Sequence, residues 1–491
     1  QRANRDKKYN YLSRPRRFGK SGLVDTLEAY VLGKKELFEG LKIMQMETEW
    51  VKRPVIRLDM SRAGAAPESV RSYLDNAFHQ IESEYDIAVR QDSSLADRFD
   101  AIIQTAYNKT GLQVAILIDE YDSPLQHSWK TPQHEACTAV YREVFAILKA
   151  DDKYEKFVFI TGITKFTQIS LFSVLNNLSN ISFEPNYAAI CGITKEEVLR
   201  DFKPEINKLA AKNDWNLDEA VAQLAAYYDG YHFCHENMVD VFNPFSLINA
   251  LADSKLKNYW ASSGATSTLP KFVDNMEIRL KDFENCPVDC DTLETSDVTG
   301  GGAELFLYQS GYLTIKGYQM GVYILGFPNS EVRQALYETV LPALTLRGNS
   351  DIQSIQSDLL LAIQLGNLPE AMKCLKALIA DVPYSNKKLA SMDMEERYRL
   401  IMSTIFNAIG CRVEVEKMIA TGRIDMVVET TQYIYVLELK LSDNGGVDAA
   451  AEQIRAKQYA EPFKADKRKV IALAIELDDR GKGLVDWKEV F

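Results

Sequence analysis

The stretch that decides the fold is SRPRRFGKS, from Ser13 to Ser21. Its second half, Gly19-Lys20-Ser21, matches the end of the phosphate-binding pattern G-x-x-x-x-G-K-[ST]. Its first half departs from that pattern, because Arg14 stands where the first glycine is expected. The lysine of such a loop places a positive charge against phosphate oxygens, and the N–H groups of the following helix hold them. The stretch therefore predicts a nucleotide-binding loop with an altered first half.

Several interpretations of this loop stay open. The tripeptide at 19–21 could be a helix N-terminus with a capping serine and no ligand. Arg14 either changes the path of the loop or sits where the backbone φ is ordinary, since glycine would allow a positive φ there. The three arginines Arg14, Arg16 and Arg17 could add fork-like phosphate contacts, or they could form a solvated basic turn.

A second motif supports the nucleotide site. VAILIDEYD at 114–122 is an apolar strand that runs into Asp119 and Glu120. In such a motif one carboxylate holds Mg²⁺, together with the hydroxyl of Ser21, and the other polarises an attacking water. Thr161 lies near the end of the next strand, where its hydroxyl could sense the γ-phosphate or position water. Parallel strands end at one edge of a sheet, so we expect these residues to gather there; the alternative for Asp119 is a helix cap.

Composition fits a globular protein of several domains. The chain has 491 residues, of which 46% are hydrophobic, enough for about two to four domains. The longest apolar runs, VAILI at 114–118 and VIALAI at 470–475, are shorter than the roughly 18 residues of a membrane span, so no membrane partner is expected. The net charge of −12 excludes a generally basic surface but permits a local basic groove.

Two features bear on the compartment. Seven cysteines without paired spacing favour a reducing environment, so a cytoplasmic protein is expected. The first residue is Gln1 rather than methionine, so we expect the true start and any targeting signal to be missing.

Periodicity predicts four parts. Residues 1–190 alternate short apolar strands with helical patterns, which predicts a doubly wound parallel sheet of the α/β class. Residues 191–285 read as a helical lid. Residues 286–380 contain a hairpin beside a short helix, typical of a winged-helix-like unit, followed by helices and a linker near 381–388. Residues 381–491 read as a helix, three strands, a helix at 447–463 and a strand.

The last part carries a second group of charged residues. Asp425 lies early on the strand GRIDMVVE, and Glu438 and Lys440 lie on the next strand, YVLELKL. Alternation places Glu438 and Lys440 on one face. Two carboxylates and a lysine can bind Mg²⁺ and hold an activated water against a phosphodiester. The alternative is a solvated edge strand, but Leu437 and Leu439 make an ordinary edge a poor fit.

Further candidates flank these strands. Upstream, Glu395 or Glu396 opens an amphipathic helix, where an acidic first turn favoured by the helix dipole is the alternative. Downstream, Gln453 and Lys457 lie one helical turn apart and Tyr459 follows. These three side chains are a possible phosphate-facing set or an ordinary surface helix.

These motifs identify a resemblance. The chain resembles bacterial proteins that join an AAA-ATPase-like domain to a C-terminal domain of the PD-(D/E)XK nuclease superfamily, and the resemblance extends from about Tyr9 to the C-terminus. The matching stretches are YLSRPRRFGKS at 11–21, LIDEYDSPL at 117–125, ITGITKFTQISLFSVLNNLSNIS at 160–182, YYDGYHF at 227–233, FNPFSLINAL at 242–251, NYWASSG at 258–264, LYQSGYLTIK at 307–316, GRIDMVV at 422–428 and ELK at 438–440.

The resemblance implies an AAA+-like P-loop NTPase sheet with a lid and a winged-helix-like region, and a restriction-endonuclease-like α/β domain. It implies that the arginine-bearing loop is a working variant of the phosphate cradle. It carries over as nucleotide and Mg²⁺ residues Lys20, Ser21, Asp119 and Glu120, and as the nuclease core Asp425, Glu438 and Lys440. Glu395 departs from the pattern, because the family's glutamate is followed three residues later by Tyr-His and this chain has Tyr398-Arg399.

The leading hypothesis is a protein that binds and hydrolyses ATP and carries a Mg²⁺-dependent nuclease-like domain. Its partner is expected to be nucleic acid, DNA before RNA, with the nucleotide state controlling access. The alternative is a nucleotide-dependent switch or interaction protein whose nuclease-like domain binds without cleaving. A toxin or defence effector would share the same parts. An oligomer is compatible with the sequence but is not specified by it.

Overall fold

The chain forms two compact units in a computed structural model that describes residues 7–87, 93–129, 131–164, 178–262, 283–295, 302–344, 349–380, 382 and 392–491. Unit 1 consists of Gln1–Asp214, Asp229–Ala252 and Asn285–Gly326. Unit 2 consists of Trp215–Tyr228, Asp253–Glu284 and Phe327–Phe491. The predicted four-part division is finer than this grouping and stays a prediction. Most of the predicted linker at 381–388 lies outside the described residues.

Unit 1 is built on a parallel five-stranded sheet with the order β2-β3-β4-β1-β5. Its strands are β1 (Tyr9–Ser13), β2 (Val55–Asp59), β3 (Val114–Asp119), β4 (Glu155–Gly162) and β5 (Ser179–Asn180). Every residue of β3, an interior strand, is buried. A parallel sheet of this kind needs helices on both faces, which is the α/β architecture that the sequence predicts.

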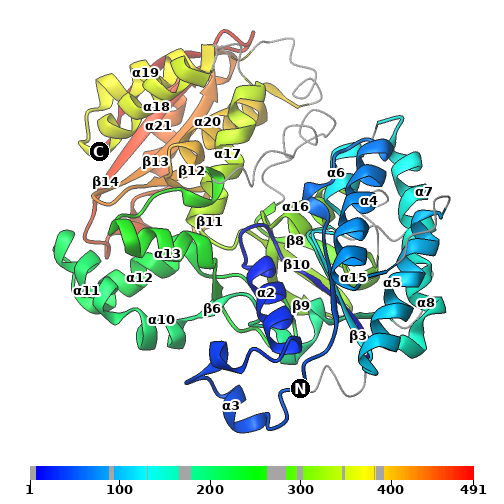
Figure 1. Cartoon of the computed structure of the whole chain (residues 1–491). Coiled ribbons are helices and arrows are strands. Elements are labelled where there is room, and N and C mark those ends of the chain that lie inside the picture. Colours follow the sequence, from blue (N-terminus) through cyan, green and yellow to red (C-terminus); the bar gives the residue numbers. More distant parts are fainter. Residues whose placement is uncertain are drawn as a thin grey trace. The chain divides into compact units, whose positions relative to one another are not determined.

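Helices cover both faces of this sheet. On one face Val24 of α2 packs in the same cluster as Leu117 and Phe159. Helices α4, α5 and α7 lie together on the other face (Figure 1). The main helices around the sheet are α2 (Lys20–Val31), α3 (Ile43–Met46), α4 (Pro67–Glu84), α5 (Leu95–Thr110), α6 (Ser123–Ser128), α7 (His134–Phe145) and α8 (Ile147–Ala150). Within the described part of the chain, no helix is long and apolar enough to span a bilayer.

The remainder of unit 1 combines short helices with small antiparallel sheets. The predicted helix and hairpin are present, and β8 adds a third strand in the order β8-β10-β9. These elements are β6 (Ile193–Thr194), α10 (Lys195–Asp201), α11 (Lys203–Lys212), β7 (Val241–Phe242), α13 (Pro244–Asp253), β8 (Cys286–Asp289), α15 (Cys290–Thr295), α16 (Ala303–Ser310), β9 (Thr314–Gln319) and β10 (Val322–Gly326).

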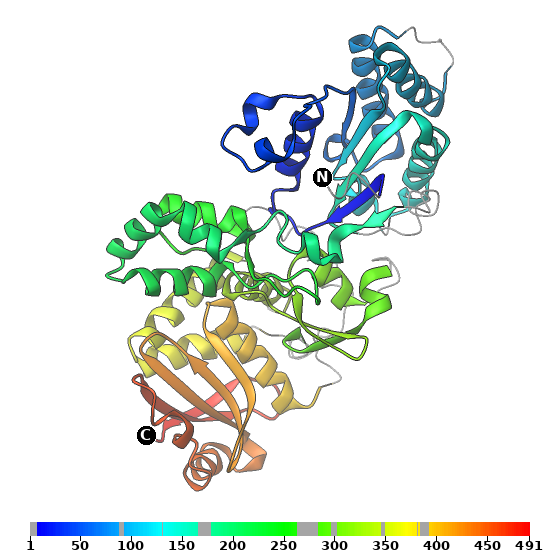
Figure 2. The same cartoon turned by 90° about the horizontal axis from the view of Figure 1, so that it is seen from below.

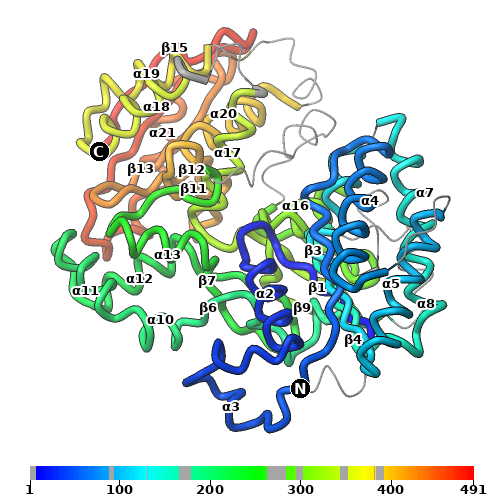
Figure 3. Tube along the Cα trace, viewed as in Figure 1, coloured from blue at the N-terminus to red at the C-terminus, as the bar shows by residue number. Residues whose placement is uncertain are grey.

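Two of these distant segments pack against the loop between β1 and α2, which Figure 3 traces beside β3 and β4. The buried ring of Phe18 makes edge contacts with Tyr231, at 4.8 Å between centroids, and with Phe233, at 5.3 Å. The Tyr231 hydroxyl donates to the carbonyl of Gly311. Gly311 has φ +91°, and a Cβ there would lie 2.5 Å from the Cβ of Pro15. The loop is therefore fixed by aromatic packing and by one close backbone approach.

Unit 2 contains a mixed five-stranded sheet with the order β11-β12-β13-β14-β15. Its strands are β11 (Arg412–Ile419), β12 (Gly422–Glu429), β13 (Tyr433–Leu441), β14 (Lys469–Leu477) and β15 (Leu484–Glu489). Only the pairing of β13 with β14 is parallel among these neighbours. Figure 2 shows the orange and red strands of this sheet side by side.

The helices of unit 2 cover both faces of its sheet, because α20 contacts β11, β12 and β13 while α21 contacts β13, β14 and β15. The predicted helix 447–463 is too long: α21 ends at Ala456, and Gln458 with φ +52° breaks it before a short 3₁₀ turn. The helices are α12 (Leu217–Tyr228), α17 (Ser330–Leu344), α18 (Asn349–Gln364), α19 (Leu368–Ala380), α20 (Met394–Ala408) and α21 (Gly446–Ala456).

The contact between Gly311 and Pro15 predicts a specific loss of stability. Gly311→Ala should lower the midpoint of thermal unfolding more than Gly321→Ala. Both glycines have positive φ, a conformation that costs an alanine roughly 1–2 kcal/mol, but an added Cβ at Gly321 meets nothing within 4 Å. Thermal unfolding followed by circular dichroism compares the two variants. Equal decreases in the unfolding midpoint of the two variants would mean that Pro15 moves away from the added Cβ without destabilising the fold.

Candidate functional site

The loop from β1 to α2 lies at the carboxyl end of the parallel sheet. Its left-handed residues are Arg17, with φ 69°, and Gly19, with φ 72°. Gly19 is the N-cap of α2, and among the described residues no side chain caps this helix start. The interpretation of Ser21 as a capping serine therefore does not hold. The exposed hydroxyl of Ser21 and the first N–H groups of α2 make an anion-binding end.

Arg14 has a structural task behind this loop. Its side chain is 1% exposed and donates to the carbonyls of Ser13, Ser182, Tyr187 and Ile190. The guanidinium carbon also lies 4.1 Å from the ring centre of Phe233. Burial lowers the pKa of Arg14 to about 10. Since its φ is not positive, arginine replaces the expected glycine without backbone strain, and its guanidinium is directed to backbone carbonyls.

Lys20 is held at the mouth of the loop. Its side chain is 3% exposed, and Nζ donates to the carbonyls of Arg14, at 3.1 Å, and Pro15, at 3.3 Å. Glu120 Oε1 lies 3.5 Å from the same Nζ. Glu120 has φ +50°, a left-handed conformation that few non-glycine residues adopt. The structure thus brings the predicted lysine and the predicted second carboxylate into contact.

Asp119 and Thr161 end adjacent strands and bind each other. The hydroxyl of Thr161 donates to Asp119 Oδ1 at 2.6 Å, and the N–H of Glu120 points to the same hydroxyl oxygen at 3.4 Å. Asp119 is 2% exposed and Thr161 is fully buried. Thr161 therefore orients the carboxylate of Asp119, a contact that the sequence interpretation did not foresee.

Asp122 is a residue of this site that sequence reasoning missed. This buried carboxylate accepts, through Oδ2, the N–H of Ile163 at 3.0 Å and both the N–H and the hydroxyl of Thr164 at 2.6 Å. Gln126 donates to the same oxygen and accepts from Arg16 Nη2 at 3.2 Å. The sequence signal that could have identified Asp122 is its place as the third acidic residue of DEYD at 119–122. Arg16 is thereby tied to the Asp122 network.

The exposed Arg17 lies on the other side of the loop. Its guanidinium carbon is 5.1 Å from the ring centre of Phe245. The predicted nucleotide residues, Arg16, Arg17, Gly19, Lys20, Ser21, Asp119, Glu120 and Thr161, thus come from the β1–α2 loop, the start of α2 and the carboxyl ends of β3 and β4.

The second group of predicted residues lies in unit 2. The ladder between β12 and β13 runs as far as Met426 opposite Leu437. Asp425 and Glu438 are the next residues on the two strands, and Asp425 Oδ2 accepts the N–H of Leu439 at 2.9 Å. Their side chains are 5% and 1% exposed. Two carboxylates therefore stand as buried neighbours across adjacent strands.

Glu438 lacks the partners that a buried charge needs. Lys440 Nζ lies 3.3 Å from its Oε1, and neither oxygen accepts a hydrogen bond from the described part of the chain. Burial first, and then the charge of Asp425, raise the pKa of Glu438 to about 8, while Lys440 opposes this shift. Hard oxygen donors short of positive charge suit a divalent cation.

The strand that carries Glu438 is not an edge. β13 lies between β12 and β14, and its Val436 packs with Ile454 of α21. Leu437 lines a small cavity with Phe406 of α20 on the opposite face. Alternation therefore places Glu438 on the α21 side of a central strand, which excludes a solvated edge.

Glu395 lies near this pair but is engaged elsewhere. Its carboxylate is 3.9 Å from Arg399, whose Nη1 donates to Glu416 at 2.6 Å. Burial is the main cause that raises the pKa of Glu395, and Asp425 contributes in the same direction. No three His, Cys, Asp or Glu side chains within the described ranges are arranged to hold a metal ion. Glu395 is thus paired with Arg399 in this arrangement, and its place among metal ligands stays a prediction.

Gln453 and Tyr459 meet beside the strand of Asp425. Gln453 Nε2 lies 3.0 Å from the Tyr459 hydroxyl, which donates to the carbonyl of Arg423 at 2.7 Å. The ring of Tyr459 is 1% exposed in the core under α21. Lys457 is exposed. The pair therefore braces the start of β12, two residues before Asp425.

Comparisons with known proteins agree with this geometry. Residues 1–172 match a family described as "Predicted AAA-ATPase", and residues 393–487 match "PD-(D/E)XK nuclease superfamily". A protein of Azotobacter chroococcum mcd 1, "Uncharacterized protein in vnfD 5'region", is 30% identical over 496 residues, covering 97% of this chain and 91% of the relative. The resemblance expected from the sequence is confirmed. The chain belongs to the same family as the Azotobacter protein and joins an AAA-ATPase-like domain to a domain of the PD-(D/E)XK nuclease superfamily.

Proposed function

We propose that unit 1 binds and hydrolyses ATP and that unit 2 is a Mg²⁺-dependent nuclease. The observation that carries the first half is the uncapped start of α2 with Lys20 and Glu120 in contact beside it. Phosphate oxygens would replace the loop carbonyls and Glu120 as partners of Lys20, because a buried ammonium needs anionic or carbonyl acceptors.

The residues of unit 1 divide the work. Ser21 and Asp119 would hold Mg²⁺, which neutralises phosphate charge when bound. Thr161 keeps Asp119 in one orientation through its 2.6 Å hydrogen bond. Glu120 orients an attacking water once phosphate has taken its place at Lys20. Arg16 and Arg17 remain candidates for further phosphate contacts.

The nuclease half rests on Asp425 and Glu438. Both are buried neighbours, and the carboxylate of Glu438 is short of hydrogen-bond partners. They would hold Mg²⁺, which supplies charge stabilisation for phosphodiester cleavage when bound. Lys440 is placed to steady a water or the developing negative charge. Gln453 and Tyr459 position the strand of Asp425.

The proposed substrate is nucleic acid, with DNA preferred over RNA, and cleavage is proposed to respond to the nucleotide state of unit 1. Both domains belong to one chain, so a single preparation reports on both. An interaction module that binds without cleaving is the alternative, and the same experiments distinguish the two.

Two substitutions should separate ATP binding from ATP hydrolysis. Lys20→Ala removes the phosphate-facing cation and should lower ATP affinity at least about tenfold. Glu120→Gln keeps size and hydrogen bonding and should retain ATP affinity, while hydrolysis falls about 10²-fold. Calorimetry and a phosphate-release assay measure the two effects. Lys149→Ala, an exposed lysine of α8, is the control. Unchanged ATP affinity in folded Lys20→Ala would remove the phosphate site.

Asp425→Asn should abolish divalent-dependent cleavage. The carboxylate charge is lost while size is kept, and losing metal-based charge stabilisation costs about 10³-fold in rate. The full chain is assayed on plasmid DNA, single-stranded DNA and RNA with Mg²⁺ or Mn²⁺, with and without ATP. Asp486→Asn on β15 is the exposed control. A parent protein that cleaves none of these substrates under any condition would favour the interaction module.

Glu438→Gln should stabilise the metal-free protein in a pH-dependent way. The pKa of Glu438 rises from its ordinary 4.5 to about 8 on folding, so stability is lost as pH rises through this window and stays low above it. The gain from glutamine should therefore be small at pH 5 and largest above pH 8. Thermal unfolding in chelator, beside the exposed control Glu489→Gln, measures this difference. A gain independent of pH would contradict a raised pKa.

A further inference from the structure

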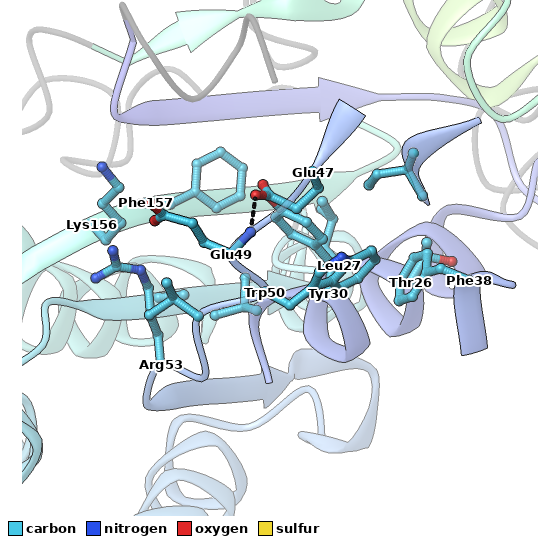
Figure 4. Close-up of a pocket in the computed structure, with 14 residues that line it drawn as sticks. Thr26, Leu27, Tyr30, Phe38, Glu47, Glu49, Trp50, Arg53, Lys156 and Phe157 are labelled. Atoms are coloured by element: carbon cyan, nitrogen blue, oxygen red, sulfur yellow. Dashed lines mark hydrogen bonds between the residues drawn. The ribbon is translucent and has the colours of Figure 1, made fainter. Parts of the chain in front are cut away.

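A second cavity, of about 340 Å³, lies in unit 1 (Figure 4). Its walls include Arg53 just before β2, Ala115 on β3, and Lys156 and Phe157 on β4. These residues lie at the amino ends of their strands, whereas the nucleotide loop follows the carboxyl end of β1. The cavity is therefore a separate site, and its volume is within the range of small-molecule pockets.

One wall of this cavity is a packed group of aromatic rings. Tyr30 contacts Trp50 and Phe38, with centroids 5.7 and 6.3 Å apart, and Phe38 lies 5.2 Å from Trp50. The Tyr30 hydroxyl donates to Glu47, which also accepts the N–H groups of Thr48 and Glu49. Phe157 adds a further ring from the sheet. The rings meet edge-to-face or tilted, so these contacts fix a rigid apolar wall against which an aromatic ring can pack.

Three of the four charged side chains of the lining lie toward one end of the cavity. Figure 4 shows Arg53, Lys156 and Glu49 there, away from Phe38 and Thr26. Neither Arg53 nor Lys156 forms an ion pair with any described residue. Glu49 is exposed and likewise makes no ion pair within the described ranges. Glu47 also lines the cavity but is held by the Tyr30 hydroxyl and two backbone N–H groups, which leaves Arg53 and Lys156 as the cations available to an anionic ligand.

A cation is a poor occupant. Aromatic cages for quaternary ammonium groups need space between the rings, but Tyr30, Phe38 and Trp50 are in direct contact. Arg53 and Lys156 would also repel a positive charge. A neutral ring would leave both cations without a partner.

We propose that this pocket binds a small planar aromatic molecule with one negative charge, such as an aromatic carboxylate. Its ring packs against Trp50 and Phe157, and its anionic group lies at Arg53 and Lys156. The anion displaces Glu49, which is exposed and free to move into solvent. The site is independent of the ATP and nuclease proposals.

The probe is 2-naphthoate, with the neutral 2-naphthamide as its matched analogue, titrated calorimetrically into the full chain. Naphthoate should bind one site at least about tenfold more tightly than naphthamide, because it gains charge-assisted hydrogen bonds. The double variant Arg53→Met with Lys156→Met should lose this preference and leave naphthamide affinity unchanged. Glu49→Gln should raise naphthoate affinity about threefold, since the competing carboxylate is removed.

Controls separate this site from others. Lys34→Met with Lys42→Met removes two exposed cations that do not line the cavity and should change nothing. Leu41→Ser removes an exposed apolar side chain outside the lining and tests unspecific binding. ATP should not displace naphthoate. The proposal is overturned if naphthoate fails to saturate one site, if the Arg53 and Lys156 variant keeps the preference, or if ATP displaces the probe.

Discussion

The buried guanidinium of Arg14 is the interaction on which the nucleotide end of unit 1 depends. It donates to carbonyls from β1 and from the segment after β5, including those of Ser182 and Tyr187, and stacks on Phe233. A buried cation with its donors satisfied fixes several chain segments at once, whereas removing one partner would leave a charge without solvation. A glycine at this position would supply only backbone freedom. Arg14 thus ties the β1–α2 loop to the segment after β5 through hydrogen bonds, which a glycine could not do.

That brace helps to hold segments that are far apart along the chain at the proposed nucleotide site. The ring of Phe18 in the loop is covered by Tyr231 and Phe233. Pro15 fits against residue 311 only because glycine has no Cβ there. None of these contacts involves a residue that is predicted to bind the nucleotide. They set where the carbonyls that hold Lys20 lie, so they act on ligand binding through loop position.

The sequence predicts whatever depends on local spacing. The β1–α2 loop, the strand of Asp119, and the alternation that pairs Glu438 with Lys440 follow from period and motif. Contacts set by tertiary packing were not predictable, among them the inward turn of Arg14. Helix α5 was missed although Ser94 and Asp97 form its capping box, because one cap signal is weak without the packing that stabilises the helix. The cavity of unit 1 was not predictable either, because its four aromatic rings come from separate elements and show no periodic pattern in the sequence.

The two carboxylates of unit 2 distinguish a catalytic from a structural interpretation. A structural buried glutamate normally has hydrogen-bond donors for its oxygens, because an unmet charge costs free energy. Glu438 has Lys440 at 3.3 Å as an ion-pair partner, but its oxygens accept no hydrogen bond of normal geometry from the described residues, and Asp425 beside it raises the cost of ionising it. A hydrophobic or amide side chain would fold this strand more cheaply. Retaining an acid in an arrangement that destabilises the metal-free fold is expected where the acid is needed for binding a cation, and this is the physical reason to prefer a nuclease over an interaction module.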